Sequence, residues 1–496
     1  MSAWTEAAVA AALGLPAPSG VTAFTYSGVS TDTRQVTTGQ LFVALRGESH
    51  DAHAYLGQAE AAGARGAVVD HVPEGAPAAL TYYVVTDTTE ALGRLGRFRR
   101  RQVGARVCAV AGSNGKTTTK ELLRAALGAK YSVHATGGNY NNLIGAPLTL
   151  LDAPDGVDVI VAEIGTNMPG EIAQLAAIVE PDAAVITGIS AEHLEGLGDL
   201  EGVLREEASV IAWVPRNGAI VVSDDPPMLA ERARGMHVAV QVAGLTDGAD
   251  IELRGRNVEL DEEGRVRFQW AGREVQLELR GRHNARHALV ALGIARAWDV
   301  PVDDAIAALR TLQPPKMRTE FHRIGELVVI SDCYNANPAS VLAAADLLAS
   351  MPARGGRVAV LGSMLELGPR SAEIHAEVAA DLADEDFDVV LATGEFAAAF
   401  DAHRGTLGDR LITADEALAA FDELAGRMTG NELVLLKGSR GVARERLLPR
   451  FEEKWGSLHP HGEALGSRAI DSTTGMRDDA RPAEHPQDDH TGARGG

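Results

Sequence analysis

The chain has 496 residues, of which 45% are apolar, so it can bury several cores and is expected to form about three domains. Its formal net charge of −22 argues against nucleic acid or an anionic membrane surface as the main partner, because both bind clustered basic residues. The two cysteines, Cys108 and Cys333, exclude a disulfide framework and argue against a zinc site built on thiolates.

The start of the chain predicts neither a membrane span nor a signal peptide. No apolar run approaches the ~18 residues that a membrane helix needs, and the first basic residue is Arg34. Residues 5–14 are interpreted as a short Ala-rich helix. We therefore expect a cytoplasmic protein without membrane insertion.

The first region, residues 1–103, is expected to be a small α/β domain. A basic stretch from Arg94 to Arg101 closes it and is interpreted as a solvated helical linker, with a phosphate-binding role as the alternative. Its strand-like runs are residues 41–45, 66–69 and 81–85.

The second region, residues 104–311, alternates buried-strand and helix patterns, which predicts a parallel sheet covered on both faces. Near its end, residues 251–280 alternate apolar and polar side chains around a turn at Ala271-Gly272, which predicts an appended antiparallel meander. The buried-strand runs are residues 106–112, 157–165, 183–189 and 218–223.

The third region, residues 312–457, repeats the pattern of an apolar strand followed by glycine, and predicts a second, Rossmann-like α/β domain. Asn337 before Pro338 is a helix-start signal. The tail, residues 458–496, is expected to be disordered, because from residue 461 on it has no Phe, Trp, Tyr or Val. The strand runs of this region are residues 326–332, 357–363, 387–394 and 432–439.

A phosphate loop is the sharpest feature. The run Gly112-Ser113-Asn114-Gly115-Lys116-Thr117-Thr118 follows a predicted strand and opens a predicted helix, so that its amides and the helix N-terminus favour an anion. Lys116 would reach the outer phosphates, and the Thr117 hydroxyl would help to hold Mg²⁺. The strict pattern asks for glycine where Val110 stands, so a glycine turn before an ordinary helix is the alternative.

Two residues at other strand ends are candidate metal ligands. Mg²⁺ prefers oxygen ligands, and Glu163 ends the most apolar strand; the alternative is a surface acid. His193 follows another strand, either as a second metal ligand or as a structural hydrogen-bonding residue.

Eight motifs in order along the chain resemble the Mur ligases of peptidoglycan synthesis. The resemblance runs from about residue 22 to 448. Two further segments support it, STDTR (30–34) and LFVALRGESHDAH (41–53). It implies a UDP-sugar domain, a central ATPase domain and a C-terminal domain. The implied reaction joins D-alanyl-D-alanine to UDP-N-acetylmuramoyl-tripeptide, with ATP and Mg²⁺, through an acyl phosphate. The motifs are GSNGKTTTKE (112–121), GGNYNN (137–142), AEIGTN (162–167), EHLEGLG (192–198), GRHNARHAL (281–289), DCYNANP (332–338), LGSMLELG (361–368) and LKGSRG (436–441).

The resemblance also implies residue roles. The catalytic residues would be Lys116, Glu163, His193 and Arg318, and the metal ligands Thr117, Glu163, His193 and Glu207. The nucleotide would contact the phosphate loop, Asn284 at adenine, Arg318 at the phosphates, Asp332 at ribose, and Tyr334, Asn335 and Asn337 in the cleft. The substrates would contact Asn139, Asn141 and Asn142 for the muramoyl-peptide, Ser30, Thr31, Asp32, Arg34, Gly47, Asp51 and His53 for the UDP part, and Lys437, Ser439 and Arg440 for the amine. Asp32 and Arg34 can equally form a structural pair. The alternative for Lys437, Ser439 and Arg440 is that they only cap a helix.

Two positions depart from the family pattern. Many relatives carry a carbamylated lysine fourteen positions after the histidine that matches His193, where this chain has Glu207. We expect Glu207 to replace it as a metal ligand, directly or through water; the rival is that Glu206 or Glu207 is a solvated helix acid. Relatives often have glycine before the arginine that matches Arg318, where this chain has Met317.

Three alternatives stay open: another Mur ligase, a folylpolyglutamate synthase-like ligase, and an inactive ATP-binding regulator. The UDP-type motifs disfavour the folate enzyme, and no D-N-P-R or D-D-P-x motif for a diamino acid occurs in the third region. An inactive regulator would have lost Lys116, Glu163 or His193, and all three are present. The family suggests a monomer; the sequence leaves the third residue of the peptide substrate open.

Overall fold

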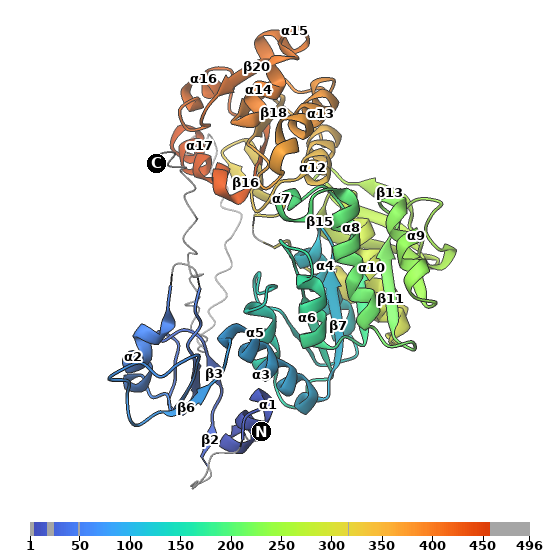
Figure 1. The fold of residues 1–496 in the computed structure, drawn as a ribbon. Helices are drawn as coiled ribbons and strands as arrows, with labels where there is room; N and C mark the ends of the chain where they lie inside the picture. Colours follow the sequence, from blue (N-terminus) through green and yellow to red (C-terminus); the bar gives the residue numbers. More distant parts are fainter. Residues whose placement is uncertain (1–3, 17–23, 48–49, 316, 457–496) are drawn as a thin grey trace, which may run out of the picture. The chain divides into compact units, whose positions relative to one another are not determined.

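The computed structural model describes residues 4–16, 24–47, 50–315 and 317–456. They form α/β layers around three sheets that are parallel except for one edge strand (Figure 1). Within these residues, no helix combines the length and the apolar character that crossing a bilayer requires. The predicted disordered tail lies outside the described residues.

The N-terminal sheet has four parallel strands in the order β3-β4-β5-β6, namely Val29–Ser30, Leu41–Val43, Gly66–Val69 and Thr81–Val84. Helices α1 (Glu6–Leu13) and α3 (Thr88–Val103) pack on one face, and α2 (Leu56–Ala61) packs on the other. Helix α1 confirms the predicted N-terminal helix. A short antiparallel pair joins β1 (Trp4–Thr5) to β2 (Thr25–Tyr26).

Helix α3 confirms that the basic stretch is helical, and Arg94, Arg97 and Arg101 are exposed. The prediction that the whole stretch is solvated is wrong for Arg99 and Arg100, which are anchored. Arg99 is buried; its Nη2 donates to the Ala153 carbonyl at 2.5 Å and its Nη1 lies 2.8 Å from Asp155. Arg100 pairs with Asp182 at 2.7 Å. Local charge suggested exposure, but the acceptors come from distant parts of the chain.

The central sheet is parallel, as predicted, in the order β12-β11-β10-β7-β9-β8. Side chains of α4 (Lys116–Gly128), α10 (His283–Ala297) and α11 (Val302–Leu309) cover one face. The other face is covered by α5 (Gly145–Leu151), α6 (Glu171–Val179), α8 (Leu200–Ala208) and α9 (Pro227–Met236). The strands are β7 (Arg106–Ala111), β8 (Val133–Ala135), β9 (Val159–Glu163), β10 (Ala183–Ile186), β11 (Ala219–Ser223) and β12 (Val240–Ala243).

The predicted antiparallel meander is confirmed as a separate three-stranded sheet of β13 (Arg256–Leu260), β14 (Arg265–Trp270) and β15 (Arg273–Arg280). Strands β14 and β15 meet at the turn Ala271-Gly272, where both residues have positive φ. The inward side chains of these two strands, such as Phe268 and Leu277, bury against α10.

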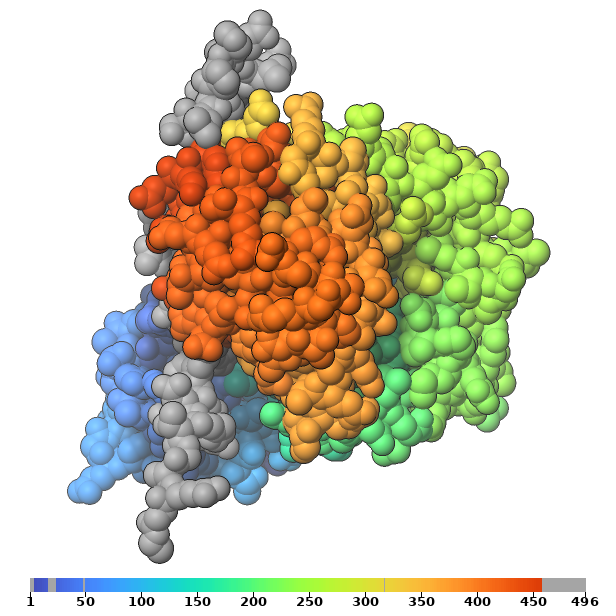
Figure 2. Space-filling model, turned by 90° about the horizontal axis from the view of Figure 1, so that it is seen from above, coloured from blue at the N-terminus to red at the C-terminus, as the bar shows by residue number. Residues whose placement is uncertain are grey.

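The C-terminal sheet has the order β16-β17-β21-β18-β19-β20, and only the edge strand β16 is antiparallel to its neighbour. Its helices are α12 (Pro338–Ser350), α13 (Ser371–Ala383) and α14 (Glu395–Asp401) on one face, with α16 (Phe421–Gly426) and α17 (Leu448–Trp455) on the other. Figure 2 shows the outer surface of this part in orange and red. The strands are β16 (Glu320–Ile324), β17 (Leu327–Asp332), β18 (Arg357–Leu361), β19 (Val389–Thr393), β20 (Leu411–Ala414) and β21 (Leu433–Lys437).

The structure confirms one local prediction about this third region and adds two strands to it. Asn337 begins α12 through a capping box, since its side chain accepts from the Ser340 amide and Ser340 accepts from the Asn337 amide. Strands β16 and β20 were not predicted, because they are short and carry polar residues among the apolar ones.

The sheet order decides where chemistry can gather. Strand β7 lies between β10 and β9, so the segments that follow these three strands meet at one edge of the central sheet. Ligands of open parallel α/β sheets bind at the carboxyl ends of the strands. The phosphate loop follows β7, Glu163 is the last residue of β9, and His193 follows β10.

Candidate nucleotide and substrate site

The loop after β7 packs tightly against the end of β10. Gly112 has φ +117°, and a Cβ there would lie 2.4 Å from the Thr187 hydroxyl, so only glycine fits. The Ser113 amide donates to the Gly188 carbonyl at 2.9 Å, and the Ser113 hydroxyl donates to the Ser190 carbonyl at 3.3 Å. These contacts fix the backbone that would surround an anion.

Gly115 precedes α4 in the left-handed region, with φ +75°. A Cβ at Gly115 would lie 2.1 Å from the ring of His287, which packs beneath the loop from α10. Burial lowers the pKa of His287 to about 3, so this ring is neutral at neutral pH. No described side chain caps α4, which leaves the amides of its first turn, including Thr118, available to an anion.

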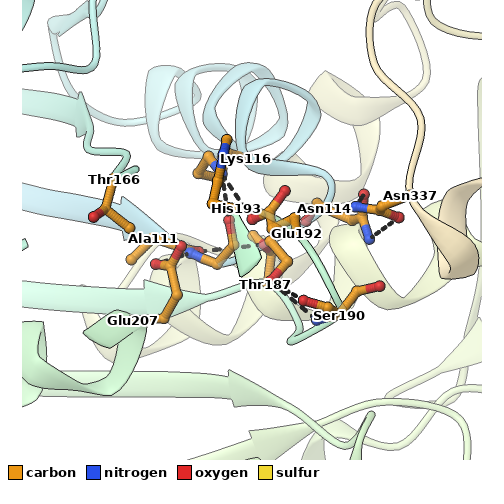
Figure 3. A network of polar contacts seen from close by, with 12 residues as sticks. Ala111, Asn114, Lys116, Thr166, Thr187, Ser190, Glu192, His193, Glu207 and Asn337 are labelled. Carbon is orange, nitrogen blue, oxygen red and sulfur yellow. Dashed lines mark hydrogen bonds and ion pairs between the residues drawn. The ribbon is translucent and has the colours of Figure 1, made fainter. Parts of the chain in front are cut away.

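Lys116 is held among acidic groups (Figure 3). Its Nζ donates to the Gly112 carbonyl at 2.5 Å and lies 3.8 Å from Glu192 Oε1. Burial alone would lower the pKa of Lys116, but Glu192, Glu207 and Glu163 together raise it above its usual value. The side chain is therefore a firmly charged ammonium.

Glu163 is buried at the end of β9, which rules out the surface acid considered from the sequence. Its Oε1 accepts from the Thr117 hydroxyl at 3.3 Å and from Asn141 Nδ2 at 3.0 Å. Its Oε2 is buried without a hydrogen-bond partner among the described residues. The carboxylate thus faces the phosphate loop with one acceptor atom unused.

Glu207 lies under the phosphate loop from α8. Its Oε2 accepts from the Gly112 amide at 2.7 Å, and burial raises its pKa to about 7. Its neighbour Glu206 turns the other way and accepts from the amides of Gly170 at 2.7 Å and Ile172 at 2.8 Å, at the start of α6. Both side chains are buried, so neither is the solvated helix acid considered from the sequence.

His193 adopts a left-handed conformation, φ +52°, at the start of the short helix α7 (Leu194–Leu197). Its Nδ1 contacts a carboxylate oxygen of Glu366, from the segment after β18. Burial opposes protonation of His193, but Glu366 and Glu192 outweigh it and raise the pKa above its usual value.

Arg318 reaches the phosphate loop from the third region. Its Nη2 donates to the Thr117 hydroxyl at 3.1 Å. Its guanidinium lies 4.2 Å from the ring centroid of Tyr334, a cation–π contact that orients it. The exposed Arg440 lies farther from the same ring, at 5.8 Å.

Asp332 and Lys437 are neighbours across β17 and β21 and form an ion pair at 2.8 Å. Lys437 also donates to the Asn335 carbonyl at 2.5 Å, and Asp332 accepts from the Thr319 amide at 3.1 Å. The Ser439 hydroxyl accepts from an amide after β18. Lys437 and Ser439 therefore hold strand ends together, and Arg440 is the exposed member of the predicted amine group.

Asn114 and Asn337 exchange two side-chain amide hydrogen bonds, at 3.0 and 2.8 Å (Figure 3). The phosphate loop is thereby joined to the start of α12. Asn284 lies in the first turn of α10, where its Nδ2 donates to the Arg280 carbonyl at 2.6 Å.

The predicted muramoyl-peptide residues have different surroundings. Asn141 binds Glu163, as described, whereas Asn142 accepts through Oδ1 from the amides of Ile144 and Gly145 and so supports the start of α5. Asn139 is exposed.

The predicted UDP residues lie around the N-terminal sheet, and no hydrogen bond between described residues joins them to the phosphate loop. Asp32 and Arg34 form the structural pair, with Nη2 2.7 Å from Oδ2. Asp51 accepts from the His53 ring at 2.6 Å, and His53 Nε2 accepts from the Asp70 amide at 3.1 Å. The other members are Ser30, which bonds the Asp32 carbonyl, Thr31, which is half-buried, and Gly47, which bonds the His50 carbonyl.

Comparison with known proteins decides the family. Residues 110–295 match the Mur ligase middle domain, and residues 317–440 match the domain described as "Mur ligase, glutamate ligase domain". The UDP-N-acetylmuramoyl-tripeptide–D-alanyl-D-alanine ligase of Bacillus subtilis is 34% identical over 426 residues, which cover 85% of this chain and 92% of that protein. The chain belongs to the Mur ligase family. It is an ATP-dependent carboxylate–amine ligase.

Other relatives agree with this membership. The enzyme of the same name from Escherichia coli is 34% identical and covers 86% of this Mur ligase and 94% of its own length. A crystal structure of MurF from Acinetobacter baumannii, 30% identical, superposes with a TM-score of 0.82 over 91% of this chain and 99% of that one. MurF from Thermotoga maritima, whose structure holds ADP, is 27% identical and superposes with a TM-score of 0.75 over 86% and 97% of the two chains.

Two residues at the site of this Mur ligase were not predicted from the sequence. Glu192, next to His193, places its buried carboxylate beside Lys116, and only its position directly before a candidate ligand gave a signal. His287 supports Gly115 from another helix, and nothing in its local sequence indicates that contact.

Proposed function

We propose that the protein joins D-alanyl-D-alanine to UDP-N-acetylmuramoyl-tripeptide with ATP, in the cytoplasmic synthesis of peptidoglycan precursors. The observation that carries the proposal is the phosphate loop with Lys116 beside the buried Glu163, in a chain whose relatives bear the name of this reaction.

The chemistry needs an activated carboxyl group. A carboxylate oxygen of the peptide attacks the γ-phosphorus of ATP, the bond to the β,γ-bridging oxygen breaks, and ADP leaves. The amine nitrogen of the dipeptide then attacks the acyl carbon and loses a proton, and the bond to the phosphate oxygen breaks. An amide, ADP and phosphate result.

The chain's own residues suit the charge that this transfer develops. Lys116 and the open amides at the start of α4 would hold the outer phosphates, and Arg318 is oriented toward Thr117 by Tyr334. Asn141 and Thr117 orient Glu163.

Mg²⁺ fits the donor set at this edge of the sheet. Thr117, Glu163, His193 and Glu207 would hold it, and the unpartnered Oε2 of the buried Glu163 is the observation that supports this. When bound, Mg²⁺ would neutralise phosphate charge during transfer.

The remaining roles follow from the family motifs. We propose Asn284 at the adenine and Asp332 at the ribose, with Tyr334, Asn335 and Asn337 lining the nucleotide cleft. Asn139, Asn141 and Asn142 would meet the muramoyl-peptide. Lys437, Ser439 and Arg440 would meet the amine. The UDP part would contact Ser30, Thr31, Asp32, Arg34, Gly47, Asp51 and His53. The proposed domains are residues 1–103, 104–311 and 312–457, in a monomer.

A single assay tests the reaction. Purified protein is incubated with UDP-N-acetylmuramoyl-tripeptide, ATP and Mg²⁺, and phosphate release is measured with and without D-alanyl-D-alanine. We expect release to require the dipeptide. Release that ignores the dipeptide, or that responds better to a free amino acid, would overturn the assignment. Running both the lysine and the diaminopimelate tripeptides identifies the third residue.

A further inference from the structure

Arg444 is a buried guanidinium without a counter-ion among the described residues. It opens the 3-10 helix η7 (Arg444–Leu447) after β21 and has 6% of its surface exposed. The other buried arginine of the described chain, Arg99, has Asp155 as its counter-ion at 2.8 Å. Arg444 has no carboxylate within 4.0 Å in that part of the chain. An unpaired buried charge is costly, so this position favours an anion from outside the chain.

Most of the hydrogen-bonding capacity of Arg444 is unused. Its Nη2 donates to the Thr393 hydroxyl, which in turn donates to the Leu361 carbonyl at 3.0 Å. Its Nε is buried and has no hydrogen-bond partner among the described residues. A guanidinium carries five N–H donors in a planar fork. The side chain is therefore held at one point, and its other donors are free for a ligand.

Arg444 lies where three neighbouring parallel strands end, in the order β21-β18-β19. Thr393 is the last residue of β19, and Gly362 directly follows β18. A Cβ at Gly362 would lie 2.3 Å from Arg444 Nε, and one at Gly438, directly after β21, would lie 3.3 Å from Arg444 Cγ. The chain leaves β18 toward α13 and β21 toward α17, which cover opposite faces of the sheet. Open α/β sheets bind ligands at such points.

A short segment connects this position to the candidate site. Residues 362–366 begin beside Arg444, and Glu366 contacts the ring of His193. The segment is fixed from one side by Ser439, whose hydroxyl accepts from the Leu365 amide at 3.0 Å. Gly394, next to Thr393, is exposed, so these strand ends lie near the surface.

The charged groups around Arg444 do not replace a counter-ion. Burial lowers the pKa of Arg444 below its usual value, and the nearby acids Glu416 and Glu445 offset only part of this effect. Arg440, four residues earlier, is exposed, so water can solvate its charge. Of these two arginines, Arg444 is the one that gains most from an anionic ligand.

We propose that Arg444 binds the terminal carboxylate of the incoming dipeptide and so makes the enzyme specific for an amine substrate with a free acid end. The proposal rests on the proposed function, which supplies D-alanyl-D-alanine as that substrate. A carboxylate matches the planar fork of a guanidinium with two parallel hydrogen bonds. The amine of an extended dipeptide lies about 7 Å from its carboxylate, so it extends from Arg444 along residues 362–366 toward the acyl phosphate.

Two dipeptides that differ only in the charge of one end test this role. Phosphate release is measured with D-alanyl-D-alanine and with D-alanyl-D-alaninamide, whose end is neutral. The wild type should prefer the acid by about 30-fold in kcat/KM, the usual effect of hydrogen bonds to a charged group. Arg444→Met should reduce this preference below about threefold through loss of activity on the acid alone. Arg446→Met, an exposed arginine of the same short helix, is the matched control and should keep the preference.

Three outcomes would overturn the proposal. The preference for the acid could survive in Arg444→Met. It could disappear in Arg440→Met instead, which would assign the carboxylate to the exposed arginine. Arg444→Met could also raise the KM for the muramoyl-peptide and leave the preference intact, which would assign the guanidinium to a carboxylate of that substrate.

A thermal melt separates binding from packing. Arg444→Met should not lower the midpoint of thermal unfolding, because an apolar side chain of similar length replaces an unpaired buried charge. A lower midpoint with equal losses on both dipeptides would show that Arg444 only packs, which contradicts the proposal. Failure of the proposed function is distinct: wild-type phosphate release would then ignore the dipeptide. Dipeptide-dependent release with the preference intact in Arg444→Met would refute the carboxylate role alone.

Discussion

Lys120 donates a hydrogen bond through its buried Nζ to the Thr136 carbonyl oxygen at 2.8 Å. The same ammonium donates to the Gly138 carbonyl at 3.3 Å and pairs with Glu121 at 3.1 Å. The helix after the phosphate loop is thus tied to the segment that carries Asn141, the partner of Glu163.

Lys120→Met should therefore uncouple these parts. Two carbonyls lose their donor, which lowers the free energy of unfolding by about 2 kcal/mol. The midpoint of thermal unfolding should fall by about 5 °C. The KM for the muramoyl-peptide substrate should rise more than the KM for ATP. Lys130→Met, which removes an exposed ammonium that lies just beyond the end of the same helix and bonds the Asp299 carbonyl, is the control. Equal changes in both KM values would show that Lys120 only stabilises the fold.

Gly115→Ala should weaken nucleotide binding at least about tenfold, because the new Cβ meets the His287 ring and a left-handed alanine costs about 1 kcal/mol. Calorimetric titration with an ATP analogue measures it. Gly128→Ala, at the other end of α4 with nothing within 4 Å, should bind normally. Adding His287→Ala to Gly115→Ala should restore part of the affinity, since it relieves the clash but not the φ angle. No restoration would contradict the contact.

Glu207 predicts a pH-dependent stability in metal-free protein. Burial raises its pKa from 4.5 to about 7, so the folded protein keeps a proton that the unfolded chain releases. The contribution of this proton to the free energy of unfolding is fully present below pH 4.5 and is lost as the pH rises through 7. Relative to the wild type, Glu207→Gln should gain stability from pH 5 to 8, by up to about 3 kcal/mol.

Urea unfolding in EDTA at several pH values measures this gain. Glu206→Gln serves as a contrast, because it replaces one of the two oxygens that accept from the Gly170 and Ile172 amides with an NH2 group, and should lower stability across the whole range. A Glu207→Gln difference that is flat with pH would mean that the carboxylate is ionised throughout.

Arg318→Lys should lower kcat by about 100-fold, although it keeps the charge. Lysine lacks the planar guanidinium that lies over the Tyr334 ring and reaches the Thr117 hydroxyl. Arg323→Lys, an exposed arginine on the neighbouring strand β16, should leave kcat unchanged. Steady-state phosphate release checks both. Near-normal turnover in Arg318→Lys would mean that positive charge alone suffices.

The features that the sequence predicts well are those that local residues determine. Strand β9 is a continuous apolar run, as expected of a parallel strand buried on both faces, and the phosphate loop carries its glycines and lysine within a few positions. The cap at Asn337 is equally local. These elements appear where they were predicted.

The features that it misses depend on partners far along the chain. Arg99 is charged and yet buried, because the carbonyl of Ala153 comes from another part of the chain to meet it. Edge strand β16 carries polar residues and is defined by its pairing with β17. Glu192 becomes significant only when folding brings β7 beside β10 and places Lys116 next to it.

Helix α3 has a practical consequence for anyone who wants to express part of this enzyme. Its residues Leu92 and Leu95 belong to the same apolar cluster as Leu148 of α5, and a Cβ at Gly96 would lie only 2.8 Å from the backbone of Pro147. A recombinant fragment that starts at residue 104 would lack α3, so the apolar side chains of α5 would be exposed to solvent and the fragment would tend to aggregate. Starting the fragment before Thr88 would keep the cover in place.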